Sequence, residues 1–283
     1  MTPRYPFSFL FMTSATDVAR EAEAAGVDWI FLDLERMGKH ERQGGRSTII
    51  SDHTFADVER MRAAVTTAQV LARINPLHAG TRQEVEDALS AGAHAIMLPM
   101  FTAPEAVEEF VGYVNGRAVT WALMETVAAV IRAETIVSVP GVDRVHVGLN
   151  DLHLTAGLNF MHESLAGGLI DHVARCIRRA PSPPVFGFGG SARIAENHPV
   201  PPSDVLREHA RVGSHAIIVS RTFHKDASSV EELRSRMNLA DELAALRRVL
   251  DEAAARTPDE AEADRLRIHR TIFDVARGFR QRR

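Results

Sequence analysis

Residues 119–125 read VTWALME, and residues 144–151 read RVHVGLND. Each stretch is a short, nearly unalternated apolar run that leads into a carboxylate, Glu125 in the first and Asp151 in the second. Such runs are typical of parallel strands that helices cover on both faces. Amphipathic stretches such as 104–114 lie between runs of this kind and fit the covering helices. The pattern predicts a β/α protein with acidic residues at the ends of its strands.

The same alternation continues along the chain and predicts the fold. Strands are expected at residues 7–12, 29–35, 70–75, 95–98, 118–125, 142–149, 185–189 and 216–221. Gly26, Gly92 and Gly213 each lie just before one of these runs, where a helix ends and the chain turns into a strand. Eight strands that alternate with helices predict a (β/α)₈ TIM barrel. A doubly wound open sheet is the alternative, but no Gly-x-Gly-x-x-Gly pattern follows the first strand.

The C-terminal part of the chain exceeds what a barrel needs. We expect residues 1–228 to form the barrel core and residues 229–283 to form C-terminal helices. Residues 229–254 show one long helical pattern, and a further helix is expected to start with Thr257 as N-cap and Pro258 at its first position. One helix completes the barrel, so the additional one needs another surface. We expect it to pack on a neighbouring subunit of a homo-oligomer.

Composition excludes several classes of partner. The chain has 283 residues, 45% hydrophobic and 25% charged, which is ordinary for a globular protein. A net charge of −4 gives no reason to expect nucleic acid or an anionic membrane as partner. No apolar run approaches the ~18 residues of a membrane span. Cys176 is the only cysteine, which excludes an intrachain disulfide and a thiolate zinc cluster and fits cytoplasmic, reducing conditions.

Charged residues at the strand ends carry the chemical prediction. Glu35, Glu125 and Asp151 follow three expected strands, and Arg73 lies near the end of another. In a barrel these ends share one face, where active sites lie. Two carboxylates, Glu125 and Asp151, suit a hard divalent cation such as Mg²⁺, Mn²⁺ or Co²⁺. The alternative is structural: such acids can cap helices, and Arg73 can pair with Glu35 inside the barrel mouth.

Arg73 beside a divalent cation indicates the type of substrate. A guanidinium binds a planar carboxylate with two hydrogen bonds, while a metal takes one carboxylate oxygen and a neighbouring carbonyl oxygen. A 2-oxo acid such as pyruvate offers this chelate, and the metal would stabilise the enolate formed from its methyl group. A Schiff-base mechanism needs a lysine on a strand. The only lysines, Lys39 and Lys225, are expected in loops, which argues against a Schiff-base mechanism.

Five segments together resemble the HpcH/HpaI aldolase and citrate lyase family. They are residues 26–35 (GVDWIFLDLE), the strand of Arg73, residues 92–99 (GAHAIMLP), residues 123–126 (LMET) and residues 141–152 (GVDRVHVGLNDL). The resemblance implies a (β/α)₈ barrel with a divalent metal on Glu125 and Asp151 and a substrate carboxylate on Arg73. It also implies carbon–carbon bond chemistry through an enolate of pyruvate or of an acyl-CoA. A swapped C-terminal helix and oligomers are common in the family.

The sequence departs from the family at the proton-transfer residue. Pyruvate aldolases of this family carry Asp-x-Glu-His after the second strand, whereas this chain has Arg36 at the histidine position. His53, His78 and His153 are candidate bases, and His53 leads because Asp52 precedes it in a long loop. Arg36 could instead bind an anionic substrate.

The resulting prediction is a metal-dependent pyruvate aldolase acting on a 2-oxo acid and an aldehyde. Arg73, Glu35 and His53 are its expected catalytic residues. The expected substrate-binding residues are Arg73, Gly148, Asn150, Gly189, Gly190 and Arg36. One alternative is an acyl-CoA lyase or thioesterase, for which Arg36, Arg42 and Arg46 would supply positive charge. The other is an inactive barrel with a binding role.

Overall fold

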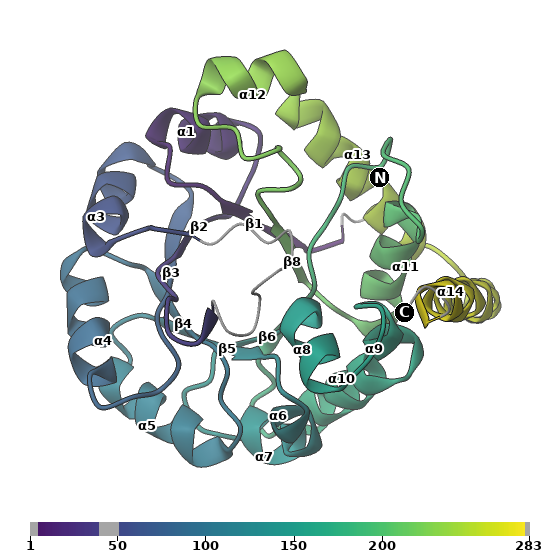
Figure 1. The fold of residues 1–283 in the computed structure, drawn as a ribbon, viewed down its shortest axis with the longest axis horizontal. Coiled ribbons are helices and arrows are strands. Elements are labelled where there is room, and N and C mark those ends of the chain that lie inside the picture. Colours follow the sequence, from purple (N-terminus) through teal and green to yellow (C-terminus); the bar gives the residue numbers. More distant parts are fainter. Residues whose placement is uncertain (1–4, 40–50, 281–283) are drawn as a thin grey trace.

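The computed structural model describes residues 5–39 and 51–280. Within these residues the chain forms an eight-stranded parallel barrel ringed by helices (Figure 1). The strands are β1 (Ser8–Met12), β2 (Trp29–Asp33), β3 (Gln69–Arg73), β4 (Ala95–Leu98), β5 (Val119–Met124), β6 (Arg144–Val147), β7 (Val185–Phe188) and β8 (Ala216–Val219). The prediction of a TIM barrel is confirmed, with most strands one or two residues shorter at one or both ends than the apolar runs.

Strand order follows chain order around the barrel, with β1 between β2 and β8. The seam between β7 and β8 closes through a parallel bridge from Gly190 to Ile218 and a 2.7 Å hydrogen bond from the His215 amide to the Phe186 carbonyl. The β2–β3 register places Asp33 directly beside Arg73, the last residues of their strands. The charged ends of neighbouring strands therefore meet at one mouth of the barrel.

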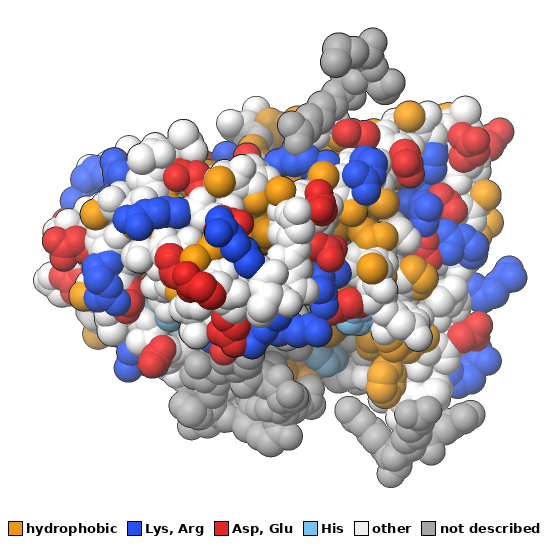
Figure 2. Space-filling view, turned by 90° about the horizontal axis from the view of Figure 1, so that it is seen from above, with side chains coloured by type: hydrophobic (Ala, Val, Ile, Leu, Met, Phe, Trp, Pro, Cys, Tyr) orange, Lys and Arg blue, Asp and Glu red, His pale blue; other side chains and the backbone are white. Residues whose placement is uncertain are grey.

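The helices surround the barrel, and most of them cover the outside of its strands, as β/α crossovers require. They are α1 (Thr16–Ala24), α3 (Phe55–Ala64), α4 (Thr81–Ser90), α5 (Pro104–Val114), α6 (Val127–Ile131), α7 (Ala133–Val137), α8 (Leu149–Thr155), α9 (Glu163–Ala166), α10 (Leu169–Arg179), α11 (Pro202–Val212), α12 (Val230–Arg236), α13 (Leu239–Ala254) and α14 (Pro258–Arg280). None of the described helices is both long enough and apolar enough to cross a membrane. The face in Figure 2 shows acidic and basic side chains interspersed, in keeping with the nearly balanced charge.

Apolar side chains pack in two layers. The larger layer lies between the strands and the surrounding helices, and the smaller fills the barrel. In the inner layer Trp29 and Trp121 meet edge to face, with ring centroids 5.8 Å apart. The Arg144 guanidinium lies over both rings, 5.1 Å from the centroid of Trp29 and 5.3 Å from that of Trp121. The interior is thus a packed core, as small barrels require.

The C-terminal segment differs from the pattern expected for residues 229–254. The predicted single helix is two, α12 and α13, because Met237 adopts an extended conformation and the Asn238 side chain caps α13 by accepting a hydrogen bond from the Asp241 amide. The predicted helix start at Thr257-Pro258 is confirmed, and the Thr257 hydroxyl accepts a hydrogen bond from the Glu260 amide.

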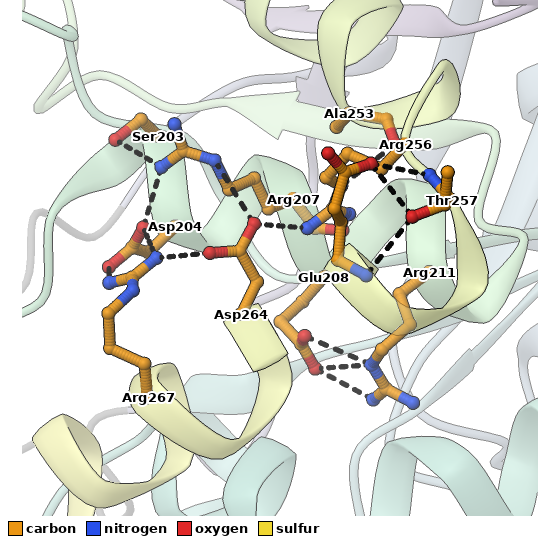
Figure 3. A network of polar contacts seen from close by, with 11 residues as sticks. Ser203, Asp204, Arg207, Glu208, Arg211, Ala253, Arg256, Thr257, Asp264 and Arg267 are labelled. Atoms are coloured by element: carbon orange, nitrogen blue, oxygen red, sulfur yellow. Dashed lines mark hydrogen bonds and ion pairs between the residues drawn. The ribbon is translucent and has the colours of Figure 1, made fainter. Parts of the chain in front are cut away.

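Helix α14 lies outside the ring, against α9 and α11 of the same chain (Figure 1). Ion pairs fix it there (Figure 3). Arg267 binds both carboxylate oxygens of Asp204 on α11, at 2.6 and 2.8 Å, and Arg207 binds the same carboxylate at 2.7 Å. Arg256 reaches Asp264 at 2.6 Å. Packing of this segment on a neighbouring subunit stays a prediction, which the exposed Phe273 on α14 supports.

Candidate active site

A cavity of about 320 Å³ opens at the mouth formed by the C-terminal ends of the strands. Its lining includes the predicted site residues Arg73, Glu125, Gly148, Asn150, Asp151, Gly189 and Gly190. Met12, Leu123, Leu149, Met161 and Ile218 add apolar surface. The cavity therefore combines a few charged groups with apolar walls, as small-molecule sites do. The described lining does not include Glu35, His53 or Arg36.

Asp33 is the centre of the charged cluster at one side of the cavity. Its carboxylate accepts hydrogen bonds from Arg73 Nε at 2.9 Å and from the Ser51 hydroxyl at 3.0 Å. A second Arg73 nitrogen lies 2.8 Å away, and the Lys39 ammonium lies at 2.5 Å. Burial alone would raise the pKa of Asp33, but the charges of Arg73 and Lys39 outweigh it and hold that pKa well below its usual range. Asp33 is thus ionised and fixes both cations.

Glu35 lies behind this pair. Its side chain is buried, with one oxygen 3.4 Å from an Arg73 nitrogen and 3.7 Å from Lys39 Nζ. The predicted contact between Arg73 and Glu35 is therefore present, but Asp33 is the nearer partner. Arg73 keeps its planar group at the cavity edge, oriented by two carboxylates. An arginine held in this way is suited to bind a substrate carboxylate.

Glu125 and Asp151 bring two further carboxylates to the cavity. Glu125 directly follows β5, and Asp151 lies in the first turn of α8; both are buried. The Met100 amide donates to a Glu125 oxygen at 3.3 Å. A Cβ atom added at Gly148 would lie 2.6 Å from the other Glu125 oxygen. Glycine at this position therefore allows the carboxylate to occupy its place.

This donor set fits a hard divalent cation. Among residues 5–39 and 51–280, no three His, Cys, Asp or Glu side chains gather as a complete metal cage. Mg²⁺ commonly binds one or two carboxylates and takes its other ligands from water and substrate. Glu125 and Asp151 would hold such an ion at the cavity, where a bound substrate can complete its coordination.

The structure gives His53 and Arg36 positions beside the cluster. His53 is buried, and its Nδ1 atom accepts a 3.0 Å hydrogen bond from the Asp33 amide. Burial lowers the pKa of His53, so the ring is neutral at pH 7. The Arg36 side chain donates to the Asp52 and His53 carbonyls, at 3.1 and 3.4 Å. Two roles stay predictions: that of His53 as the base and that of Arg36 in substrate binding.

The other candidate bases have local partners. His78 lies 3.3 Å from Glu84, and His153 Nδ1 lies 3.3 Å from the Leu149 carbonyl. Arg42 and Arg46, considered for an acyl-CoA, lie outside the described residues.

Two cavity residues, Lys39 and His146, escaped sequence analysis. Lys39, expected in a loop, is in fact buried, and its ammonium lies at the cavity; burial, followed by the charge of Arg73, lowers its pKa. Arg221 follows β8 and lines the cavity; its strand-end position in the sequence had indicated a possible source of positive charge there. His146 lies on β6 inside the barrel. The apolar run around it does not reveal from the sequence that its side chain faces inward.

His146 is fully buried and neutral. Its Nε2 donates to the Gly189 carbonyl at 2.9 Å, so Nδ1 carries the lone pair and has no hydrogen-bond partner among the described residues. Burial lowers the pKa of His146 to about 4. Only glycine fits at position 187, because a Cβ atom there would lie 2.6 Å from His146 Nδ1.

The glycines after β7 have a structural reason. Gly189 has a φ of +59°, and a Cβ there would approach the Leu149 side chain at 3.0 Å. Gly190 carries the bridge to Ile218 that closes the barrel. Of the nearby basic residues, Arg193 binds Glu196. These contacts support a tight turn at the rim of the cavity.

Comparisons place this arrangement among known proteins. Residues 8–165, more than half of the chain, match the family model described as HpcH/HpaI aldolase/citrate lyase. No curated protein matches the sequence significantly.

Several solved structures share the fold. An HpcH/HpaI aldolase from Desulfitobacterium hafniense DCB-2 is 18% identical, with a TM-score of 0.60 over 81% of this chain and 92% of that one. A family protein from Burkholderia cenocepacia J2315 is 19% identical, with a TM-score of 0.59 over 88% and 95%. CitE from Mycobacterium tuberculosis, in complex with magnesium, acetoacetate and coenzyme A, is 16% identical, with a TM-score of 0.57 over 92% and 84%. At these identities the likeness shows the barrel fold.

Proposed function

Because this chain belongs to the HpcH/HpaI aldolase/citrate lyase family, we propose that it is a divalent-metal-dependent carbon–carbon lyase of the class II aldolase type. It would form or cleave the bond between a pyruvate-type enolate and an aldehyde. The observation that carries the proposal is the meeting of Glu125, Asp151 and Arg73 in one cavity. Two carboxylates for a cation and a fixed guanidinium for a carboxylate are the groups that a 2-oxo acid requires.

The residues divide the work between holding and orienting. Glu125 and Asp151 would hold Mg²⁺, Mn²⁺ or Co²⁺, which when bound polarises a substrate carbonyl and stabilises enolate charge. Arg73 binds the substrate carboxylate and cannot rotate away, because Asp33 holds two of its nitrogens. Glu35 supports Arg73 from behind. The apolar walls limit water around the reacting carbons.

The reaction needs one proton removed and one delivered. In the direction of addition, the methyl carbon of pyruvate loses a proton, and the resulting enolate carbon bonds to the aldehyde carbon. The electron pair of the aldehyde carbonyl moves to its oxygen, which takes up a proton. We propose that His53 takes this proton at Nδ1, the nitrogen that carries the single lone pair of its neutral ring, after that atom gives up the hydrogen bond it accepts from the Asp33 amide.

Exchange of the pyruvate methyl protons in D₂O tests the proposal without knowledge of the aldehyde. NMR should show exchange with Mg²⁺, Mn²⁺ or Co²⁺ and loss of it when the metal is chelated. Glu125→Ala should abolish metal-dependent exchange while circular dichroism stays unchanged. Full exchange in that variant would refute the assignment of Glu125.

The same experiment separates the alternatives. Absence of exchange together with a raised Tm in the presence of free CoA would favour an acyl-CoA lyase or thioesterase. The similarity in fold to CitE, solved with coenzyme A, makes this the second candidate. Metal binding without exchange from any donor would favour a barrel with a binding role.

A further inference from the structure

A second cavity adjoins the first. It has a volume of about 120 Å³ and lies between the β7–α11 connection, α11 and the segment after α8. Met161 and Gly190 line both cavities, so the two share a wall and a rim. Met161 is unbranched and flexible, which makes it a movable partition. We call this second space the side cavity.

The walls of the side cavity are mainly apolar. Phe160, Val200, Val205, Leu206 and Ile217 contribute to them. The Phe279 ring of α14 stacks on Phe160 at 5.6 Å, so the C-terminal helix supports this wall. An apolar cavity of ~150 Å³ in another protein holds a benzene ring. The side cavity is therefore close to the size of one aromatic ring.

Two polar atoms on the lining residues need a partner. Ser191 Oγ and His162 Nδ1 are buried and have no hydrogen-bond partner among the described residues. Both atoms are closed off from solvent, so each side chain would have to rotate toward the cavity to meet a ligand; leaving them unsatisfied is costly, which favours this rotation when a polar group occupies the space. Burial lowers the pKa of His162 to about 4, which makes it neutral at pH 7. A neutral pair suits a hydroxyl better than a carboxylate.

We infer that the side cavity binds the side chain of the aldehyde, and that the aldehyde carries an aromatic ring with a hydroxyl group. This rests on the proposed function, since the aldehyde carbon must face an enolate held at Arg73 and Glu125. The ring would pass Met161 and Gly190 into the side cavity, and its hydroxyl would bond to Ser191 and His162. The aldehyde group would stay in the larger cavity.

Ala192 offers a direct perturbation with a matched control. Ala192 lines the side cavity, whereas Ala195 lies exposed in the same connection. Ala192→Phe fills the space and Ala195→Phe does not. For 4-hydroxybenzaldehyde, Ala192→Phe should lower kcat/KM by about tenfold or more, within the range set by pocket filling. For acetaldehyde, kcat/KM should change less than about twofold, and Ala195→Phe should match the wild type with both.

Ser191→Ala tests the hydroxyl contact. It should reduce the preference for 4-hydroxybenzaldehyde over benzaldehyde by about tenfold while kcat/KM for benzaldehyde stays near the wild-type value. Wild-type enzyme that prefers acetaldehyde over both ring aldehydes would overturn the inference. So would an equal loss for all aldehydes in Ala192→Phe, because that pattern reports general damage to the site.

Two further readouts separate this inference from the proposed function. Pyruvate methyl exchange should be the same in Ala192→Phe as in the wild type, and its absence from the wild type would count against the aldolase proposal alone. Phenol is a probe that requires no turnover. Calorimetry should detect its binding to the wild type and to Ala195→Phe, and not to Ala192→Phe. Failure of phenol to bind the wild type would refute the side-cavity assignment even if exchange occurs.

Discussion

Gly148→Ala offers a test of the metal site that does not remove any ligand. A methyl group at this position would lie 2.6 Å from a Glu125 carboxylate oxygen and 3.0 Å from Glu125 Cβ. Ordinary C···O contacts are ~3.3 Å or longer, so the oxygen would have to move by ~0.7 Å. The backbone itself accepts alanine, because φ at Gly148 is −80°.

A shift of this size matters because Mg²⁺ demands nearly ideal octahedral geometry. Changes to the support of a metal ligand typically cost ~10- to 100-fold in metal affinity. We therefore expect the Kd of Gly148→Ala for Mn²⁺ to rise by that factor, or ~1.4–2.7 kcal/mol. Folding stability should change by less than about 1 kcal/mol, since alanine also reduces the entropy of the unfolded chain.

Calorimetry or Mn²⁺ relaxation enhancement would measure the affinity, with urea unfolding as the stability assay. Gly112→Ala is the matched control, because a Cβ at Gly112 on α5 meets nothing within 4 Å. Wild-type Mn²⁺ affinity in Gly148→Ala, or equal losses in both variants, would refute the reasoning that Gly148 positions Glu125 for a cation.

Three other predictions concern stability and assembly. The pKa of His146 is about 4 in the folded protein against about 6.5 in the unfolded chain, so the unfolded chain binds protons preferentially between these pH values. The free energy of unfolding therefore falls by ~3 kcal/mol as the pH drops across this range. Urea titrations of His146→Gln should show a smaller loss of stability between pH 7 and 4. Asp204→Asn removes the carboxylate that holds Arg267, so amide exchange in α14 should speed up by about tenfold, whereas Asp274→Asn, at an exposed pair, should have little effect. Light scattering should show a homo-oligomer that Phe273→Glu on α14 weakens, and a monomeric wild type would contradict this.

The sequence predicted those features that depend on local pattern. Apolar runs and glycine turns located all eight strands, and the rule that barrel strands end at one face brought Glu125 and Asp151 together correctly. The interaction of Arg73 was predicted only partly, because its main partner Asp33 depends on the register between β2 and β3. Register is a property of the folded sheet, and neither strand reveals it alone.

Other site features depend on long-range packing. Lys39 carries a loop-like local sequence, and only the folded chain brings its ammonium to Asp33. His146 lies in an apolar run whose inward side chains are indistinguishable by periodicity from its outward ones. The division of residues 229–254 into two helices was missed because apolar periodicity continues across Met237, although Asn238 is a favoured capping residue.

The two tryptophan rings under the Arg144 guanidinium give the protein an intrinsic fluorescence signal from the barrel interior. Its only two tryptophans are Trp29 and Trp121, and both lie inside the barrel. Tryptophan emission therefore follows the barrel interior, while far-ultraviolet circular dichroism follows mainly the outer helices. Coincident unfolding curves from the two signals would mean that the barrel and its C-terminal helices come apart as one cooperative unit. Separate curves would reveal an order of events. Loss of the circular dichroism signal first would mean that the outer helices unfold while the tryptophans of the barrel keep their native emission.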